Sequence, residues 1–180
     1  MKRTKNPAKE AEYRKRAADL VAQMTLHEKV SQMLSWAPAI ERLGIPAYNW
    51  WSEGIHGVGR AGTATVFPQA IGMAAAFDED MMEQVGNAIG VEARGKYNMC
   101  RAHGDRDIFK GLTVWAPNIN IFRDPRWGRG HETYGEDPFL TSRLGVRFVE
   151  GMQGDDPNYL QAAACAKHFA VHSGPESDRR

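Results

Sequence analysis

Cysteine is scarce in this sequence, which has only Cys100 and Cys165 among 180 residues. The two are far apart in the chain and belong to no CxxC motif or Cys/His cluster. Disulfide frameworks and zinc sites need closely patterned cysteines. The sequence therefore predicts neither and favours two reduced, buried thiols.

Net charge is almost absent as well, since Lys+Arg 23 balance Asp+Glu 22 to leave a formal charge of +1. Proteins that bind nucleic acids or anionic membranes carry a marked excess of positive charge. We therefore expect no nucleic-acid partner, and a ligand that is small or uncharged.

Long hydrophobic runs are also missing. The longest weakly polar stretch, 61–77, is interrupted by Gly62, Pro68, Gln69 and Gly72, so it is no membrane span. The basic N-terminus MKRTKNPAKEAEYRKR is followed by no apolar segment or small-residue cleavage site. These absences predict a soluble, cytoplasmic protein with no signal peptide and no membrane partner.

The chain does contain 42% hydrophobic residues, which is enough for a packed core. Helix-forming residues fill 8–24, and Thr25 with Glu28 forms a capping box that predicts a second helix from Leu26 to about Leu34. We interpret residues 1–35 as an N-terminal helical approach.

Strand candidates alternate with helices in the rest of the chain. The predicted strands are 47–51, 70–77, 112–117 and 162–171, and the predicted helices run from Asp78 to about Tyr97 and from Asp137 to about Met152. Such alternation indicates parallel βαβ units, arranged as a small doubly wound sheet or as the front half of a barrel.

Polar residues gather where these strands end, and in both architectures ligands bind at the carboxyl ends of the strands. They are Glu53 and His56, the loop 123–136, and Lys167 with His168. The loop carries its positive charge on arginine alone, whose planar fork suits carboxylates and paired hydroxyls. This repeated placement predicts a ligand site.

Each candidate also has a purely structural interpretation. Glu53 can cap a loop or pair with His56 or Arg60, and Arg123 and Arg126 are more typical of loop staples than of ligand contacts. Lys167 follows a buried-looking strand, where an ionised lysine needs a partner or a polar pocket. Adjacent strand residues face opposite ways, so at least one of Trp50 and Trp51 belongs to the core.

Two other kinds of site receive little support from the sequence. His168 and His172 lie in strand and loop without an HExxH motif, so no metal site is predicted. The glycines of HGVGRAG lack both a Walker lysine and GxGxxG spacing, which argues against a nucleotide site.

Four stretches together resemble glycoside hydrolase family 3, the β-glucosidases and β-xylosidases, in its N-terminal barrel domain. They are YNWWSEGIHGV (48–58), TVFPQAIG (65–72), RDPRWGR with ETYGEDP (123–138), and AKHFAVHSGP (166–175). The form WWSEGIHGV is most similar to the branch with bacterial and plant-type β-xylosidases. The resemblance implies an α/β fold, the first half of a (β/α)8 TIM-type barrel over 36–180, incomplete at its C-terminus after about the fourth strand.

The resemblance also implies a sugar-binding role for particular residues. Glu53 stands where the family holds a hydroxyl of the terminal sugar, and Arg129, Lys167 and His168 stand at other sugar contacts. Arg179 lies near a further arginine of the pattern. Some of the three arginines of the loop would pair with loop carboxylates such as Asp124, Glu132, Glu136 and Asp137, which leaves Arg129 held rigidly to face a sugar. No cofactor and no metal are implied.

The family's retaining mechanism uses two carboxylates, a nucleophile and an acid/base. The resemblance implies that both lie beyond residue 180, so the sequence predicts no catalytic residue and a fragment that is inactive alone. The complete hydrolase would remove terminal β-linked xylose or glucose from oligosaccharides. The alternatives are a non-catalytic carbohydrate-binding fragment and a truncated product without function. Four parallel strands would leave an open edge, which predicts an unstable or self-associating chain.

Overall fold

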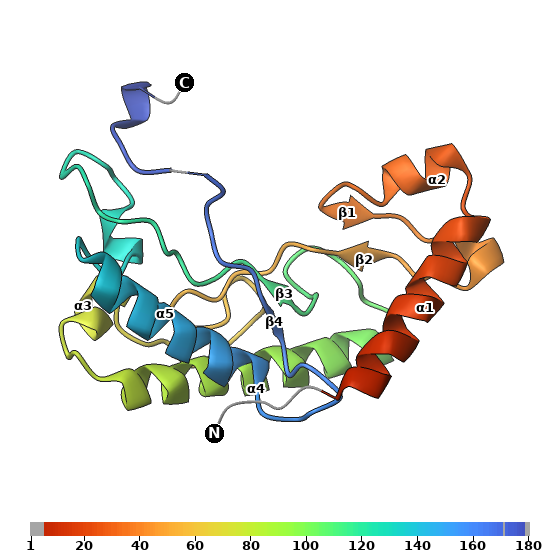
Figure 1. Cartoon of the computed structure of the whole chain (residues 1–180), viewed down its shortest axis with the longest axis horizontal. Coiled ribbons are helices and arrows are strands. Elements are labelled where there is room, and N and C mark those ends of the chain that lie inside the picture. The colour runs from red at the N-terminus through yellow and green to blue at the C-terminus, as the bar shows by residue number, and fades with distance from the viewer. Residues whose placement is uncertain (1–5, 171, 179–180) are drawn as a thin grey trace.

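The structure is a computed structural model that describes residues 6–170 and 172–178. Figure 1 shows two long helices beneath short strands, with the N-terminal helix standing at the right-hand side of the molecule. The elements in chain order are α1 (Pro7–Gln23), α2 (Leu26–Ser31), β1 (Trp36–Ala37), η1 (Glu41–Leu43), β2 (Tyr48–Asn49), α3 (Ala70–Ala74), α4 (Glu79–Ala102), β3 (Thr113–Val114), η2 (Gly130–Glu132), α5 (Pro138–Gln153), β4 (Ala163–Ala164) and η3 (Glu176–Asp178).

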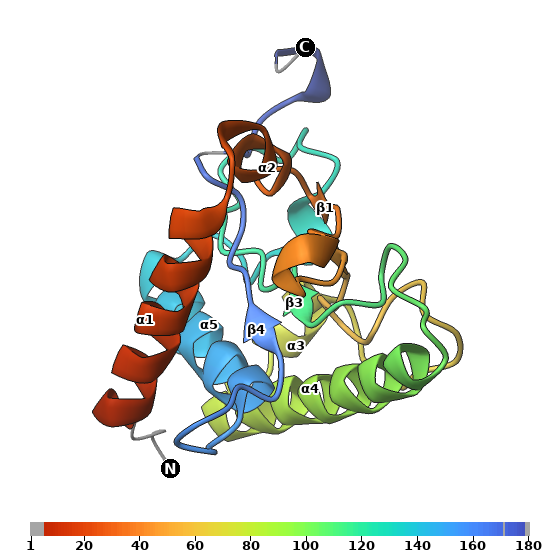
Figure 2. The ribbon, with the colours of Figure 1, turned by 90° about the vertical axis from the view of Figure 1, so that its right-hand side faces the viewer.

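The N-terminal helices begin as the sequence predicts. The Asn6 side chain caps α1 by accepting from the amides of Ala8 and Lys9, and the Thr25–Glu28 capping box opens α2. The second helix ends at Ser31, earlier than the predicted Leu34. Helix α1 buries no side chain and stands at the side of the molecule (Figure 2).

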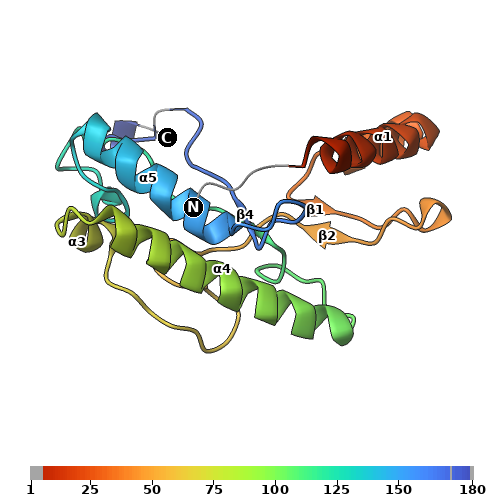
Figure 3. The same ribbon diagram turned by 60° about the horizontal axis from the view of Figure 1, so that its bottom comes forward.

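The core lies between α4 and α5, which run alongside each other in Figures 1 and 3. Asp78 and Asp137 cap the two helices as predicted, by accepting from the amides of Met81 and Leu140. Apolar residues recur at helical spacing in α4 and in α5, so each helix packs its apolar face against the other helix. The fully buried side chains of this core include Met82, Ile89, Leu144, Phe148 and Met152.

The strands above this helix pair are parallel and short. Strands β3 and β4 pair with Thr113 opposite Ala163, and parallel bridges join Ser52 to Val114 and Asn118 to Lys167. Three chain segments therefore lie side by side in the same direction. Their carboxyl ends meet at one edge, which is the arrangement that the βαβ pattern predicted.

Two predicted strands are wrong in detail. Residues 70–77 form helix α3 followed by a turn, because alanine and methionine favour helix and Ile71 is the segment's one β-branched residue. Strand β2 lies inside the predicted 47–51 but pairs with the unpredicted β1 in the antiparallel sense. Gly44, at φ 64, lets the connection turn back sharply enough for that pairing.

The cysteines also differ from the expectation. Cys165 is exposed and Cys100 is half-buried, and both are free thiols. Cys165 follows β4 directly, and within the described part of the chain β4 pairs on one side only, with β3. Among the described helices, none is long and apolar enough to cross a bilayer.

Candidate functional site

Glu53 and Lys167 are brought together by the parallel strand ends. The amide of Ser52 donates to Thr113 O at 3.2 Å, and the amide of Lys167 donates to Pro117 O at 3.0 Å. The Lys167 ammonium then lies 3.5 Å from Glu53 Oε2, with 11% of its side chain exposed. This carboxylate partner stabilises a lysine charge that burial would otherwise disfavour.

The other oxygen of Glu53 is held by a tryptophan. The Trp51 indole nitrogen donates to Glu53 Oε1 at 2.7 Å, and its ring stacks on Trp115 with centroids 4.6 Å apart. The alternative in which Glu53 pairs with His56 or Arg60 is not what the structure shows, since His56 hydrogen bonds to Phe67 O and Arg60 lies over the Phe109 ring.

The two adjacent tryptophans differ in their surroundings, but neither is part of the buried core, so the prediction that at least one of them is core is wrong. Trp50 is 46% exposed and meets Tyr48 edge-on, whereas Trp51 packs inward against Trp115. Trp51 is therefore half-buried, and its indole N–H donates to the Glu53 carboxylate.

Arg129 forms a bidentate pair with Glu132, which sequence reasoning did not assign to it. Its Nε and Nη2 each lie 2.7 Å from a Glu132 oxygen. This hydrogen bonding raises the pKa of Arg129. Burial pushes the pKa of Glu132 upward, but hydrogen bonding and charge from Arg129 and the charge of Lys167 outweigh it, so the net shift is downward. Arg129 itself is thus the arginine that pairs with Glu132, and this bidentate contact holds its guanidinium in place.

The other two arginines of the loop are staples, as expected. Arg126 pairs with Asp124 at 2.7 Å, and Arg123 donates to Ile121 O and to Ser173 Oγ. The Asp124 carboxyl has its pKa lowered to about 2, chiefly by the Arg126 side-chain hydrogen bond. These contacts fix the loop that presents Arg129.

His168 is held by Asn120, a buried residue. Both its backbone amide, at 3.0 Å, and its Nδ1, at 2.8 Å, contact the Asn120 Oδ1 atom. Its ring stacks on that of His172 with centroids 4.4 Å apart. Burial, followed by the charges of Arg129, His172 and Lys167, lowers its pKa to about 4.

The described cluster therefore combines two carboxylates, two cations and a neutral imidazole. Glu53, Lys167 and His168 come from strand ends, and Arg129 and Glu132 come from the loop at η2. Such a set offers directed donors and acceptors with little net charge, which suits a neutral polyhydroxyl ligand. In residues 6–170 and 172–178, no group of three or more His, Cys, Asp or Glu side chains could hold a metal ion. Arg179, the remaining predicted contact, lies outside the described residues.

Several supporting residues escaped sequence reasoning. Glu132 follows Arg129 by three positions, a spacing that favours pairing within one helical turn. Asn118 Nδ2 lies 3.4 Å from Glu132 Oε2, and its Oδ1 accepts from the Asn120 amide at 3.0 Å. No local pattern could have indicated Asn120 or Trp115, since their contacts depend on how the strands align.

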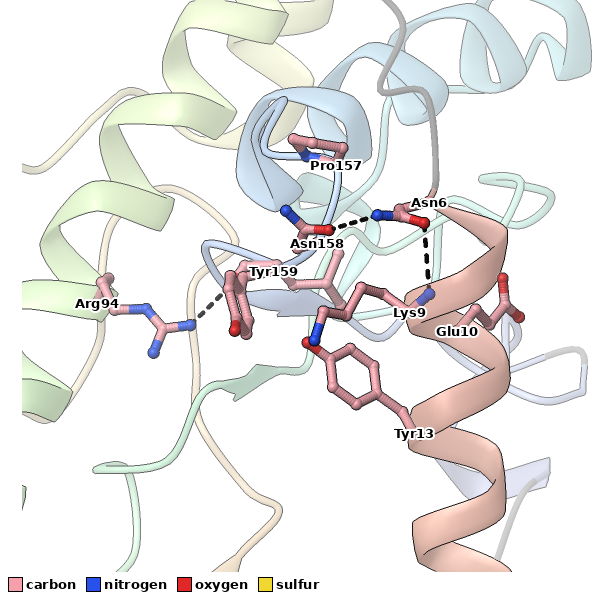
Figure 4. A pocket seen from close by; sticks show the side chains of 9 residues that line it. Asn6, Lys9, Glu10, Tyr13, Arg94, Pro157, Asn158 and Tyr159 are labelled. Atoms are coloured by element: carbon pink, nitrogen blue, oxygen red, sulfur yellow. Dashed lines mark hydrogen bonds between the residues drawn. The ribbon is translucent and has the colours of Figure 1, made fainter.

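The described residues line two sizeable cavities, and only the smaller one adjoins the cluster. One of about 280 Å³ adjoins the cluster and is lined by Asn120, Arg123, Lys167, His168 and their neighbours. A larger one, of about 420 Å³, lies between α1, α4 and the segment 157–160 (Figure 4). There Asn6 donates to Asn158, and Tyr13 faces Tyr159. Of the predicted site residues that the structure describes, Glu53, Arg129, Lys167 and His168, none lines this second cavity.

The chain is similar in sequence to a family of known proteins. The model of the glycosyl hydrolase family 3 N terminal domain matches residues 16–179. A xylan 1,4-beta-xylosidase of Xylanibacter ruminicola is 51% identical over 169 residues, covering 92% of this chain and 20% of the relative. The probable beta-D-xylosidase 7 of Arabidopsis thaliana is 50% identical, covering 88% of this chain and 22% of its own length. The chain thus spans about a fifth of the curated relatives it matches.

Solved structures agree with the sequence relatives. The exo-beta-xylosidase XlnD in complex with a xylobiose aziridine probe matches with a TM-score of 0.78 and 38% identity, over 88% of this chain and 21% of XlnD. The beta-glucosidase DesR of Streptomyces venezuelae, in complex with D-glucose, matches with a TM-score of 0.70 and 33% identity, over 91% of this chain and 20% of DesR. These likenesses confirm the predicted α/β barrel-type fold, of which the chain holds part.

Proposed function

This chain belongs to glycosyl hydrolase family 3 through the family's N-terminal domain, and on that basis we propose that it binds the terminal sugar of a β-xyloside for hydrolysis. The curated relatives named above are β-xylosidases, which favours xylose over glucose as the sugar. The hydrolase of which this domain is typical acts on O-glycosyl bonds, and in its complete form it would release terminal β-linked sugars by a retaining route.

The observation that carries the proposal is the convergence of Glu53, Arg129, Lys167 and His168. They come from three separate chain segments, and the parallel strands align the ends of two of them. Pairing of Glu53 with Lys167 and of Arg129 with Glu132 keeps all four charges at a half-buried site. Charged groups that are mutually compensated form strong hydrogen bonds to neutral hydroxyls.

The same pairings argue for binding rather than attack. A nucleophilic carboxylate must approach the anomeric carbon, with the acid/base about 5 Å away in a retaining enzyme. Glu53 is held by Trp51 and Lys167, and Glu132 is held by both arms of Arg129. We therefore expect the two carboxylates of the cluster to orient the sugar, and the chemistry to come from other groups.

The test compares binding with turnover for the 180-residue chain. Methyl β-D-xyloside should bind at millimolar concentrations, and p-nitrophenyl β-D-xyloside should release no p-nitrophenol. Turnover that disappears in Glu53→Gln, with contaminating hydrolases excluded, would assign chemistry to Glu53 and contradict this role. Absence of xyloside binding by the folded chain would remove the proposal altogether.

A further inference from the structure

The tautomer of His168 follows from the two hydrogen bonds that Asn120 Oδ1 makes with it. Asn120 Oδ1 accepts from the backbone amide of His168 at 3.0 Å, and an amide N–H can only donate. The atom at that position is therefore the carbonyl oxygen of Asn120 and not its NH₂ group. Because a carbonyl oxygen can only accept, His168 Nδ1, 2.8 Å away, must carry a proton.

The charges around the ring decide whether the second nitrogen is protonated as well. The groups facing it are Arg129, Lys167 and His172, which disfavour a cation, and Glu132, which favours one. Burial adds to the effect of the positive groups, and together they lower the pKa of His168 to about 4. At neutral pH the ring is thus uncharged, and its Nε2 has a free lone pair.

A neutral imidazole of this kind supplies what the other site residues lack. Lys167 and Arg129 can only donate hydrogen bonds. Glu53 can only accept them, and as a carboxylate it carries a negative charge. A sugar hydroxyl is both a donor and an acceptor. An uncharged acceptor among two cations gives the hydroxyl proton a partner without adding charge to the cluster.

We propose that Asn120 is a positioning residue that fixes His168 with its proton on Nδ1, so that Nε2 accepts a hydrogen bond from a hydroxyl of the bound sugar. This inference rests on the proposed sugar-binding function and assigns donor and acceptor roles within it. Asn120 acts through His168 and does not itself contact the sugar.

The experiment reads the tautomer directly. In the 15N-labelled chain at pH 7, the 15N shifts of His168 should show a protonated Nδ1 and an unprotonated Nε2. Adding methyl β-D-xyloside should shift the Nε2 resonance and leave the Nδ1 resonance nearly unchanged. A protonated Nε2 with a bare Nδ1, or an imidazolium at pH 7, would overturn the inference.

Two variants of Asn120 distinguish a role in positioning the His168 ring from a role in stabilising the fold. Asn120→Asp keeps an acceptor oxygen, so it should retain the Nδ1–H tautomer and, at pH 8, nearly the same xyloside affinity. The added negative charge should raise the pKa of His168, so xyloside binding should be lost at a higher pH than in the parent chain. Asn120→Leu has no acceptor and should mix the tautomers and weaken binding about tenfold.

The matched control is Asn158→Leu, which removes an Asn–Asn hydrogen bond at the distant α1 cavity (Figure 4). It should leave both the His168 tautomer and the xyloside affinity unchanged. If Asn120→Leu fails to fold, the pH profile of Asn120→Asp still decides, since an unshifted profile contradicts the inference. The two failures are distinguishable: a chain that binds no xyloside contradicts the proposed function, whereas the wrong tautomer contradicts the role of Asn120 alone.

Discussion

At the scale of single residues, Lys167 illustrates how the site keeps charge in a mostly buried position. Only 11% of its side chain is exposed, and its ammonium lies beside Glu53. Truncating one partner of such a pair leaves the other charge without compensation, which destabilises more than the pair itself contributes. Conservative substitutions are therefore the informative ones here.

Glu53→Gln should weaken binding of methyl β-D-xyloside about tenfold or more, because hydrogen bonds to charged groups are worth roughly 1.5–3 kcal/mol. The substitution keeps the volume of the side chain but leaves Lys167 without a counter-charge. Isothermal titration calorimetry would measure the affinity. The control Glu150→Gln removes a carboxylate that pairs with Arg147 on α5, and its affinity should match that of the parent chain. Equal affinities for all three proteins would contradict the assignment.

The stability of the chain should depend on His168 in mildly acidic solution. Its pKa falls from 6.5 to about 4 on folding, so between these values the unfolded chain binds more protons than the folded one. The free energy of unfolding should therefore decrease as the pH falls from about 6.5 towards 4. Urea unfolding at several pH values would show this decrease, and His168→Gln should reduce it. If the free energy of unfolding depends on pH identically in both proteins, the decrease comes from the protonation of groups other than His168.

At this scale the sequence pointed to the polar residues at the strand ends but not to the residues that contact and hold them. Glu53, Lys167 and His168 follow strand ends, where polar residues are conspicuous. Trp115 and Asn120 support them through contacts between separate strands, and no local pattern encodes such alignment. The sequence identified Glu132 only as one of several loop carboxylates and did not indicate which arginine it pairs with.

At the scale of elements, the pairing of α4 with α5 depends on glycine. A Cβ added to Gly151 would lie 2.0 Å from Glu83 O, and one added to Gly86 would lie 2.4 Å from Phe148 O. The two backbones therefore approach more closely than any side chain permits. This close contact fixes the α4–α5 helix pair against which β3 and β4 lie.

Two glycine-to-alanine substitutions should have opposite effects on stability. Gly151→Ala forces the helices apart and should destabilise the chain by more than about 2 kcal/mol. Gly95→Ala, on the same helix pair but with nothing within 4 Å of the added Cβ, should stabilise it by about 0.5–1 kcal/mol. Chemical denaturation would measure both. A neutral Gly151→Ala would mean that the close approach of the helices is wrong.

Element prediction succeeded where caps and periodicity agreed. The caps at Thr25, Asp78 and Asp137 each begin a helix as predicted. It failed for 70–77, a short apolar run that is equally compatible with a strand or a buried helix. Strand β1 was missed because two residues beside Pro38 carry no pattern, and their pairing depends on the turn at Gly44.

At the scale of the whole molecule, an apolar surface remains uncovered on the N-terminal side. Its residues, the α2 patch, are Leu26, Val30, Met33, Leu34 and Trp36, which are 46–83% exposed. Leu26 and Val30 lie one helical turn apart on α2 and so face the same way, and the other three follow the end of the helix. Phe169, after β4, is fully exposed as well. Such surfaces in a folded chain favour association.

The isolated chain should therefore self-associate in a concentration-dependent manner. Substituting Val30 and Met33 together with glutamate should reduce association, because it places charge at the centre of the α2 patch. Sedimentation velocity over a range of concentrations would measure both proteins. A parent chain that stays monomeric and unfolds reversibly at all concentrations would contradict this expectation.

The central claim is that four residues from three chain segments form one sugar-binding site. The most direct test is a titration of the labelled 180-residue chain with methyl β-D-xyloside, followed by NMR. We expect saturable shifts at Glu53, Arg129, Lys167 and His168, with none at the cavity beside α1. Shifts confined to that cavity, or no saturable shift in a folded chain, would contradict it.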